Sequence, residues 1–168
     1  MLSIRDAVPA DLPAVQAMNQ AAQPAVSDMP LEETRRFLEI AAYFRLAIEG
    51  DAVAGFLIGL EPGTDYASLN YAWFSERYDS FVYVDRIVIE EGFRGRGVGG
   101  ALYADFERFG RERGAPRMTC EVNTRPRNDI SLRFHAKSGF REVGEQDTEG
   151  GKKTVVMLVK EFRAAPAP

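Results

Sequence analysis

A glycine-rich turn between a strand and a helix constrains the fold of this chain more than any other feature. The run FVYVDRIVIE at 81–90 is rich in β-branched and aromatic residues, as strands are, and five of the fifteen glycines lie between residues 92 and 100. Apolar residues at helical spacing then predict a helix at 97–113, and a second strand follows at 117–122. A strand, a helix and a strand in this order form a crossover unit, which places the two strands parallel in one sheet.

The segments on either side of this unit predict hairpins. Two β-rich runs are joined by Gly50-Asp51, and two more near the end of the sequence are joined by a polar turn. The predicted elements are a strand at 2–5, a helix from PADL at 9–12, a helix at 31–42, strands at 43–49, 52–60 and 81–90, a helix at 97–113, a strand at 117–122, a helix at 128–138, and strands at 140–145 and 154–162. Hairpins and one crossover require a mixed sheet with helices on both faces. We therefore predict a single domain of the α+β class, an α/β arrangement around a mixed sheet, in the order β-α-α-β-β-β-α-β-α-β-β.

Composition excludes several classes of protein. The chain has 168 residues, which suits one domain, and no apolar run approaches the roughly 20 residues that span a bilayer. Asp6 and Asp11 interrupt the N-terminal stretch where a signal peptide needs an apolar core, so we expect a cytoplasmic protein. A single cysteine, Cys120, and a single histidine argue against a disulfide and a metal site, and the net charge of −4 argues against a nucleic-acid partner. We expect no membrane association, and a disordered tail at 164–168.

The glycine-rich turn at 92–100 has the composition of an anion-binding loop. Glycines between a strand and a helix leave backbone N–H groups open to an anion, and the helix dipole adds to the attraction. Arg94 and Arg96 supply positive charge beside these groups. Because a glycine in a helix costs about 1 kcal/mol relative to alanine, the cluster favours a phosphate site over a tight turn with a flexible cap.

A dinucleotide-binding pattern is also present in this turn. Residues 95–100 match Gly-x-Gly-x-x-Gly literally, and Glu121 follows at about the distance of an acid that binds ribose. A dinucleotide-binding strand, however, is buried on both faces, and this strand carries Asp85 and Arg86 in its middle. A P-loop is excluded because Ala101 stands where that motif has lysine. A nicotinamide-dependent oxidoreductase is therefore an alternative that rests on the glycine pattern alone.

The string RGRGVG at 94–99 resembles the pyrophosphate loop Arg/Gln-x-x-Gly-x-Gly/Ala of the GNAT superfamily of acyl-CoA N-acyltransferases, with Arg94, Gly97 and Gly99 in the matching positions. Downstream, NDISLRFHAKSGF at 128–140 resembles the superfamily's Asn-x-x-Ala/Ser helix and the Gly-Phe pair that follows it. The predicted element order is also similar to the GNAT fold over nearly the whole chain. The phrases NYAWF, FVYVDRI and EVN resemble a bacterial branch of that superfamily.

The resemblance implies a function and a set of cofactor contacts. It implies one N-acetyltransferase domain at 1–163 that transfers an acetyl group from acetyl-CoA to a primary amine, by direct attack in a ternary complex without a metal. The strand Ile87-x-Ile89 resembles the strand along the pantetheine arm, and Ile89 matches the position whose backbone N–H meets the oxyanion. The acceptor is then a small-molecule or peptide amine, and the last strand or the aromatic stretch offers a surface for a homodimer. The residues that we expect to contact the cofactor are Ile87, Val88, Ile89, Arg94, Gly95, Arg96, Gly97, Val98, Gly99, Gly100, Asn128, Ser131 and His135.

Acyl transfer to an amine needs a base, because an alkylamine with a pKa of about 10.4 is almost entirely protonated at pH 7. Glu121, in the phrase CEVN on the strand after the cofactor helix, is the first candidate. It resembles the glutamate of LEV-type strands in N-terminal-amine acetyltransferases, although its separation from Asn128 is two residues longer than in those proteins. The alternative is a surface glutamate of a strand. Asp85, on the same strand parity as Ile87, is the second candidate, with an ion pair to a nearby arginine as the alternative.

His135 is the only histidine and departs from the superfamily pattern. The position seven residues after the helix asparagine is usually a tyrosine, which resembles a general acid for the departing thiolate. On a helix, Asn128, Ser131 and His135 share one face, so we expect His135 to give a proton or a hydrogen bond to the sulfur. The missing tyrosine also motivates an alternative with the same fold, a catalytically silent acyl-CoA-binding or regulatory module.

The stretch from Glu61 to Ser80 lacks a regular pattern and contains five aromatic residues. Long loops in compact domains tend to carry function, so we expect Tyr71, Trp73 and Phe74 to form a substrate-binding wall of the acceptor site rather than a cap on the core. Cys120 is expected to be a small buried residue, because no activating base can be placed beside it.

Overall fold

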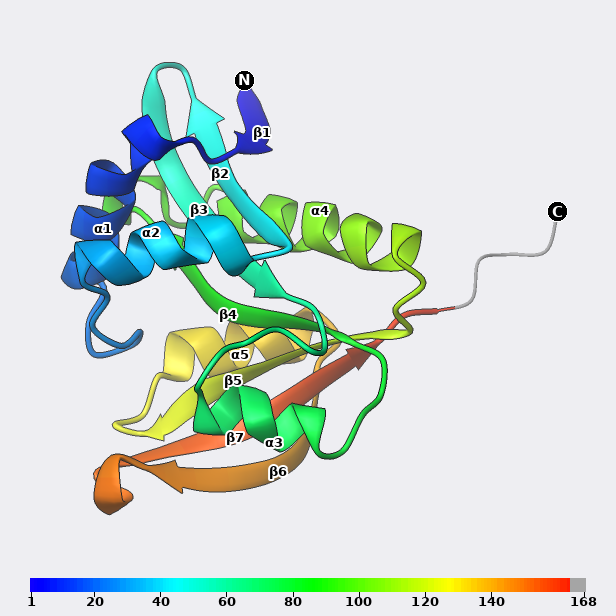
Figure 1. Ribbon diagram of the computed structural model, residues 1–168. Helices are drawn as coiled ribbons and strands as arrows, with labels where there is room; N and C mark the ends of the chain where they lie inside the picture. The colour runs from blue at the N-terminus through cyan, green and yellow to red at the C-terminus, as the bar shows by residue number, and fades with distance from the viewer. Residues whose placement is uncertain (164–168) are drawn as a thin grey trace, which may run out of the picture.

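Seven strands form one mixed sheet in the computed structural model, which describes residues 1–163; the tail predicted at 164–168 lies outside the described residues. The strands are β1 (Leu2–Asp6), β2 (Tyr43–Glu49), β3 (Ala52–Leu60), β4 (Val82–Ile89), β5 (Arg117–Arg125), β6 (Arg141–Thr148) and β7 (Lys153–Glu161). Their order across the sheet is β1-β2-β3-β4-β5-β7-β6 (Figure 1). Neighbouring strands are antiparallel except β4 and β5, which are parallel, so the prediction of a mixed sheet is confirmed.

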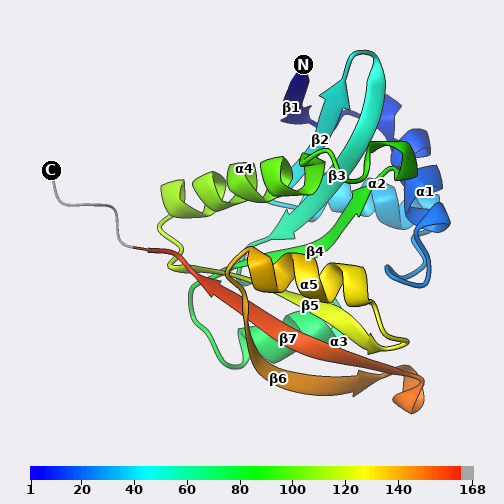
Figure 2. The same ribbon diagram turned by 180° about the vertical axis from the view of Figure 1, so that it is seen from behind.

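Within residues 1–163, five α-helices cover the two faces of the sheet. They are α1 (Leu12–Ala21), α2 (Leu31–Ile40), α3 (Leu69–Ser75), α4 (Val98–Glu112) and α5 (Asp129–Lys137), with short 3₁₀ turns η1 (Pro9–Asp11), η2 (Glu91–Phe93) and η3 (Glu149–Gly151). The helices α1, α2 and α3 lie on one face, and α4 and α5 lie on the other, as two opposite views show (Figures 1 and 2). The buried side chains form three clusters, one beneath α1 and α2, one beneath α3 and one beneath α4. None of these helices is both long and apolar enough to cross a membrane.

The element order predicted from the sequence is confirmed, with one helix added. This helix, α3, lies within the stretch 61–80, for which an irregular loop is predicted. Ser68 caps its start, because the Ser68 Oγ accepts a hydrogen bond from the N–H of Tyr71 at 3.2 Å. Tyr71 and Phe74, three residues apart, then point into the core beneath the helix. The loop prediction is therefore wrong over α3, because tertiary burial of side chains at helical spacing stabilises a helix whose local pattern is weak.

β4 and β5 pair only at their first residues. The register joins Val82 to Met118 and Tyr83 to Thr119, and no later pair connects these two strands within the described chain. Beyond these two pairs the strands diverge, although both continue for several more residues. The sheet is therefore open in its middle, and we call this gap between β4 and β5 the opening.

A bulge in β4 lies next to the point of divergence. On the neighbouring strand β3, Ile58 is paired with Arg86 and Gly59 is paired with Val84, so Asp85 is an extra residue between two ladder pairs. A bulge bends its strand and increases the local twist. The bulge therefore helps to turn the rest of β4 away from β5.

α4 is held against the sheet by close packing and by polar contacts. A side chain at Gly59 would overlap the ring of Phe106, so glycine lets α4 approach β3. Asp105 of α4 accepts hydrogen bonds from the hydroxyl of Tyr43 and from Nη1 of Arg45, each at 2.7 Å. These contacts hold the middle of α4 against β2 and β3.

Candidate active site

A cavity of about 710 Å³ occupies the opening between β4 and β5. Its walls come from both faces of the sheet: the glycine-rich turn, α4 and α5 on one side, and the α1–α2 loop (residues 22–30) and the segment that leads into α3 on the other. Strand alternation explains the two sides. Cys120 and Val122 of β5 belong to the core beneath α4, whereas Glu121 and Asn123 face the opposite layer. Within residues 1–163, no group of three or more His, Cys, Asp or Glu side chains is placed to hold a metal ion.

The glycine-rich turn ends in the N-terminus of α4. Gly95 and Gly97 have φ angles of 75° and 81°, in the left-handed region that glycine adopts readily. The first N–H groups of a helix have no intrahelical partners, and Gly97, the N-cap, places no side chain over them. A Cβ at Gly95, Gly97 or Gly100 would meet no other atom within 4 Å, so the turn leaves space for a ligand. This is the geometry that a phosphate site requires.

The two arginines of the turn are both exposed but differ in their surroundings. Arg96 lies 3.4 Å from a carboxylate oxygen of Glu49 and over the ring of Phe93. Arg94 lines the cavity, Arg96 does not, and Arg94 has no ion pair within residues 1–163. Of the two predicted cofactor residues, Arg94 is therefore the one that the structure brings to the cavity.

The backbone of β4 offers hydrogen-bonding groups to the opening. The N–H of Glu90 donates to the carbonyl of Ala54 in β3 at 2.9 Å. Because N–H directions alternate along a strand, those of Ile87 and Ile89 point away from β3, toward the space that β5 has left. Ile87, Val88 and Ile89, which are predicted to lie along a cofactor, all line the cavity.

α5 borders the cavity beside the glycine-rich turn. The ring of Phe134 would lie 3.3 Å from a Cβ at Gly99, so glycine lets α5 and α4 meet closely. Asn128 caps α5, since its side-chain oxygen accepts a hydrogen bond from the N–H of Ser131 at 3.2 Å. Asn128 and Ser131 both line the cavity, and capping gives the asparagine a structural role there.

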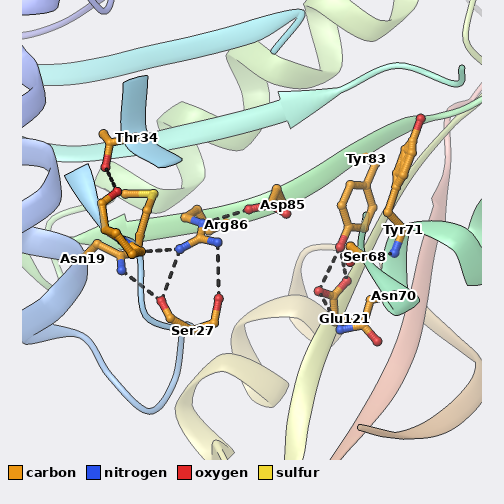
Figure 3. A network of polar contacts seen from close by, with 12 residues as sticks. Asn19, Ser27, Thr34, Ser68, Asn70, Tyr71, Tyr83, Asp85, Arg86 and Glu121 are labelled. Atoms are coloured by element: carbon orange, nitrogen blue, oxygen red, sulfur yellow. Dashed lines mark hydrogen bonds and ion pairs between the residues drawn. The ribbon is translucent and has the colours of Figure 1, made fainter. Parts of the chain in front are cut away.

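Glu121 of β5 reaches the cavity from the α3 side. The hydroxyl of Tyr83 lies 2.9 Å from both of its carboxylate oxygens, and Asn70 Nδ2 donates to Oε1 at 3.2 Å (Figure 3). Gln146 of β6 in turn donates to the side-chain oxygen of Asn70 at 2.9 Å. Glu121 is therefore positioned by β4, α3 and β6 together, which is not the environment of a surface glutamate.

The environment of Glu121 changes its acidity. Burial is the main cause that raises the pKa of Glu121 to about 8, and the charge of Asp85 adds to this effect. Hydrogen bonds from Tyr83 and Asn70 and the charge of Arg86 act in the opposite direction on the same pKa. A carboxyl group with a pKa near 8 gains and loses its proton close to neutral pH, which is the property of a general acid or base.

Asp85, the second candidate base, belongs to a buried ion pair. Arg86 Nε donates to Asp85 Oδ2 at 2.8 Å, and each side chain is only 4% exposed (Figure 3). Asp85 lines the cavity, but its carboxylate is engaged by the neighbouring arginine. The ion pair considered in the sequence analysis is therefore present, and Asp85 acts on Glu121 through its charge.

His135 lies in the cavity wall with both ring nitrogens in hydrogen bonds. Nδ1 is 2.7 Å from the carbonyl oxygen of Ser131, so we assign the ring proton to Nδ1 as donor to that oxygen. Nε2 then accepts a hydrogen bond from the hydroxyl of Tyr103 at 2.7 Å. Burial lowers the pKa of His135, so the ring is neutral at pH 7.

Tyr103 of α4 is a site residue that the sequence analysis missed. Its hydroxyl contacts His135, its ring stacks on Phe134, and it lines the cavity on the side away from Glu121. The sequence gives little indication of this role, because a tyrosine on the apolar side of a helix equally indicates a core position.

Cys120 nearby is buried as predicted, and burial raises the pKa of its thiol well above the ordinary value, which disfavours the nucleophilic thiolate.

The aromatic residues predicted to form the acceptor wall lie elsewhere. Tyr71 and Phe74 are buried in the core beneath α3, and Trp73 packs against that core. Because α3 turns them toward the sheet, Tyr71, Trp73 and Phe74 do not line the cavity, and the expectation is corrected. The same stretch does contribute to the wall through other residues, which are Tyr66, Ser68 and Asn70.

The sequence matches a family model. The model is that of the acetyltransferase (GNAT) family, and it matches residues 13–140. This range includes the glycine-rich turn, Glu121 and α5. No curated protein matches the chain in sequence.

Solved structures match the fold along nearly the whole chain. Ard1 from Thermoplasma volcanium superposes with a TM-score of 0.80 at 19% sequence identity, covering 97% of this chain and 99% of that one. The ribosomal-protein-S18-alanine N-acetyltransferase from Escherichia coli gives a TM-score of 0.74 at 16% identity, with 98% and 96% covered. An acetyltransferase of the GNAT family from Streptococcus pneumoniae gives 0.72 at 22% identity, with 97% and 100% covered. These proteins share the fold of this chain.

The raised pKa of Glu121 predicts a pH-dependent stability. The folded protein keeps this carboxyl protonated up to about pH 8, whereas an unperturbed glutamate ionises near 4.5. Between these values the folded state holds a proton that the unfolded state has lost, so this group makes the free energy of unfolding fall as the pH rises. Glu121→Gln removes the group, so its stability relative to wild type should increase from pH 5 to pH 8 by at least about 1 kcal/mol, measured by urea unfolding. Glu112→Gln, at an exposed position of α4, is the control, and a similar trend in both variants would contradict the assignment.

Proposed function

The chain belongs to the GNAT acetyltransferase family, and on this premise we propose that it transfers the acetyl group of acetyl-CoA to a primary amine, by direct attack within a ternary complex. The observation that carries the proposal is the arrangement of one cavity through the sheet. The glycine-rich turn and His135 line it on the α4–α5 side, and Glu121 lines it on the α3 side. Donor and acceptor can then approach one another from opposite faces.

The residues on the α4–α5 side fit acetyl-CoA. The N–H groups at the start of α4, with Arg94 beside them, would hold the pyrophosphate. The N–H and C=O of Ile87 and the C=O of Ile89 would bind the amides of the pantetheine arm, as a neighbouring strand would. Acetyl-CoA supplies the acetyl group as a thioester. With the arm along β4, that thioester would lie in the opening.

On the α3 side, Glu121 is the proposed base. Ionised Glu121 takes one proton from the acceptor ammonium, directly or through one water, and passes it to solvent. The neutral nitrogen then attacks the thioester carbon, and the N–H of Ile89 donates a hydrogen bond to the carbonyl oxygen as it becomes negative. The C–S bond breaks as the amide forms, the nitrogen loses a second proton, and the sulfur gains one.

The Tyr103–His135 pair is proposed to meet the departing sulfur. His135 is held by Ser131 and accepts the hydrogen bond of Tyr103, so the tyrosine hydroxyl is the group of this pair that can turn toward a thiolate. A thiolate with a pKa of about 8.5, like that of cysteine, is already a fair leaving group. The contribution of this pair to the rate should therefore be below the ~10²-fold lower end for acid catalysis.

The two alternatives from the sequence lead to different expectations. A silent acyl-CoA-binding module has no need of a half-buried glutamate with a raised pKa, so the environment of Glu121 favours an enzyme. The Gly-x-Gly-x-x-Gly site on which the nicotinamide-dependent oxidoreductase rests belongs to a doubly wound parallel sheet, whereas β4 and β5 are the only parallel neighbours in residues 1–163. The identity of the amine, the homodimer and the cytoplasmic location stay predictions.

Ligand binding tests the donor side of this proposal. CoA and acetyl-CoA should raise the melting temperature by several degrees at about 100 times Kd, and NAD should not. Gly97→Glu should abolish the rise, because a carboxylate would stand where the phosphate oxygens approach. Gly63→Glu is the matched control, since Gly63 has the same φ of 81° in open space. A folded Gly97→Glu protein that CoA still stabilises would rule out this turn as the phosphate site, and release of CoA thiol with an amine panel separates an enzyme from a silent module.

The pH–rate profile tests the role of Glu121. With a pKa near 8 the base is mostly protonated at pH 7, so kcat/KM of the wild type should rise with pH and level off above about pH 8. Glu121→Gln should lower kcat by about 10²–10⁴-fold and abolish the rise of kcat/KM with pH. Tyr83→Phe should move this rising limb of the profile to higher pH, because it removes a hydrogen bond that lowers the pKa of Glu121. A Glu121→Gln protein with the wild-type profile would show that another group is the base.

Paired variants test the thiol side. His135→Ala and Tyr103→Phe should each lower kcat by less than ~10²-fold with little change in acetyl-CoA affinity, and the double variant should lose no more than either alone. His135→Tyr restores the usual residue of the family and should keep activity. Tyr43→Phe is the control, because it removes a buried tyrosine hydroxyl bound to Asp105, away from the cavity. Equal rates for wild type and His135→Ala across pH 6–9 would exclude this role.

A further inference from the structure

A buried arginine joins three parts of the acceptor side of the cavity. Arg86 of β4 donates from Nε to Asp85 at 2.8 Å and from Nη1 to the side-chain oxygen of Asn19 in α1 at 3.0 Å. It also donates from Nη1 and Nη2 to the carbonyl oxygen and the hydroxyl of Ser27, at 3.2 and 3.3 Å (Figure 3). With only 6% of the residue exposed, the guanidinium thus binds a strand, a helix and a loop at once.

The loop that Arg86 binds spans the opening. Ser27 lies near one end of the α1–α2 loop (22–30), where Arg86 of β4 holds it. Near the other end, Asn123 of β5 donates from Nδ2 to the carbonyl of Pro24 at 3.1 Å. The loop is therefore tied to both of the strands that diverge, and several of its residues line the cavity on the side proposed for the acceptor.

The same guanidinium acts on the carboxylates of the opening. Tyr83 of β4 is paired with Thr119 of β5, and Asp85 and Glu121 each lie two residues further along their strand, where the pairing has ended and both line the cavity. The charge of Asp85 raises the pKa of Glu121, and the charge of Arg86 lowers it. Two nearby carboxylates ionise together only with difficulty, and a cation beside them relieves the repulsion.

We propose that Arg86 is a positioning residue for the amine acceptor: it clamps the α1–α2 loop over the opening and, through Asp85, keeps Glu121 able to take the acceptor's proton. The proposal rests on the function proposed above for Glu121. A purely structural link would be served as well by apolar side chains, because burying two charges costs more free energy than apolar packing of similar volume. Arginine suits a clamp, since its planar fork of donors binds several oxygens at once and lysine does not.

Arg86 is the positively charged group that acts on the pKa of Glu121. Other ionisable groups nearby interact electrostatically with Glu121 or Asp85. They are Glu33, Tyr66, Tyr83, Tyr103 and Cys120. Lys153 also lines the cavity, but it is paired with Glu149 at 3.4 Å. Loss of Arg86 should therefore have two separable effects, a looser α1–α2 loop and a higher pKa of Glu121.

Three variants separate these effects. Arg86→Lys keeps the charge but cannot make the same hydrogen bonds, and Arg86→Met removes the charge. Asp85→Asn combined with Arg86→Met removes both charges and avoids leaving a buried carboxylate unpaired. Arg45→Met is the matched control, because it breaks a different arginine–aspartate pair, with Asp105, outside the cavity.

Two measurements follow the two effects without any acceptor. Amide hydrogen exchange at 22–30 should be about tenfold faster or more in Arg86→Lys and Arg86→Met, and unchanged in Arg45→Met. A ¹³C NMR titration of the Glu121 carboxyl, assigned with Glu121→Gln, should show its final ionisation about one pH unit higher in Arg86→Met and less displaced in Arg86→Lys. In the double variant, the pH at which Glu121 ionises should return to the wild-type value or below.

Kinetics connect these effects to the acceptor. The probes are spermidine and the tripeptide Ala-Ala-Ala, as a polyamine and a peptide N-terminus. For the probe that is acetylated, Arg86→Lys should raise KM about tenfold with little change in kcat or in acetyl-CoA affinity. Arg86→Met should in addition move the pH–rate limb to higher pH, in parallel with the NMR titration.

Unchanged exchange at 22–30 or an unchanged titration of Glu121 in folded Arg86→Met would overturn the proposal. If that variant does not fold, Arg86→Lys decides the exchange, and Asp85→Asn compared with the double variant decides the titration. Failure of acetyl-CoA to bind the wild type would instead overturn the proposed function. The hydrogen exchange at 22–30 and the titration of Glu121 would still show the expected differences in that case. The two failures are therefore distinguishable.

Discussion

The divergence of β4 and β5 after two residue pairs is the constraint on which the rest of the structure depends. Strands that separate within a sheet leave backbone N–H and C=O groups without strand partners, and such groups are met by a ligand, by side chains or by water. Here the N–H groups of Ile87 and Ile89 face the gap, in an arrangement that a strand-like ligand completes. The bulge at Asp85 bends β4, so the gap is part of the fold itself.

The sheet keeps two kinds of chemistry apart. On the α4 side, the helix N-terminus and glycine backbone attract an anion, and the neutral pair of Tyr103 and His135 adds no charge near the reacting sulfur. On the other side, burial and the charge of Asp85 make Glu121 a stronger base than an ordinary glutamate. Because strand alternation sends Glu121 and its neighbours on β5 to opposite faces, the two environments meet only inside the opening.

The sequence predicts the features that have strong local patterns, and it does not predict those set by distant contacts. The glycine-rich turn, the crossover and the hairpins follow from residue type and spacing over a few residues. Glu121 is a candidate through its resemblance to the glutamate of a family strand, but its partners Tyr83 and Asn70 are 38 and 51 residues away, and nothing local marks them. The aromatic stretch shows the opposite limit. Aromatic composition indicates that side chains are buried, but it does not indicate which surface they are buried against. The sequence therefore assigns Tyr71 to a cavity wall. In the structure, Ser68 caps a helix that turns Tyr71 toward the core.

The position of β7 has a consequence for the nascent chain. Within residues 1–163, β7 is the last strand in sequence, yet it lies between β5 and β6, and it pairs with β5 over most of that strand's length. During synthesis β5 is therefore held by only two pairs to β4 and presents a bare edge until residues 153–161 have left the ribosome. A chain that lacks residues 153–161 therefore holds the strand that carries Glu121 through its two pairs with β4 and without the antiparallel neighbour that completes the sheet.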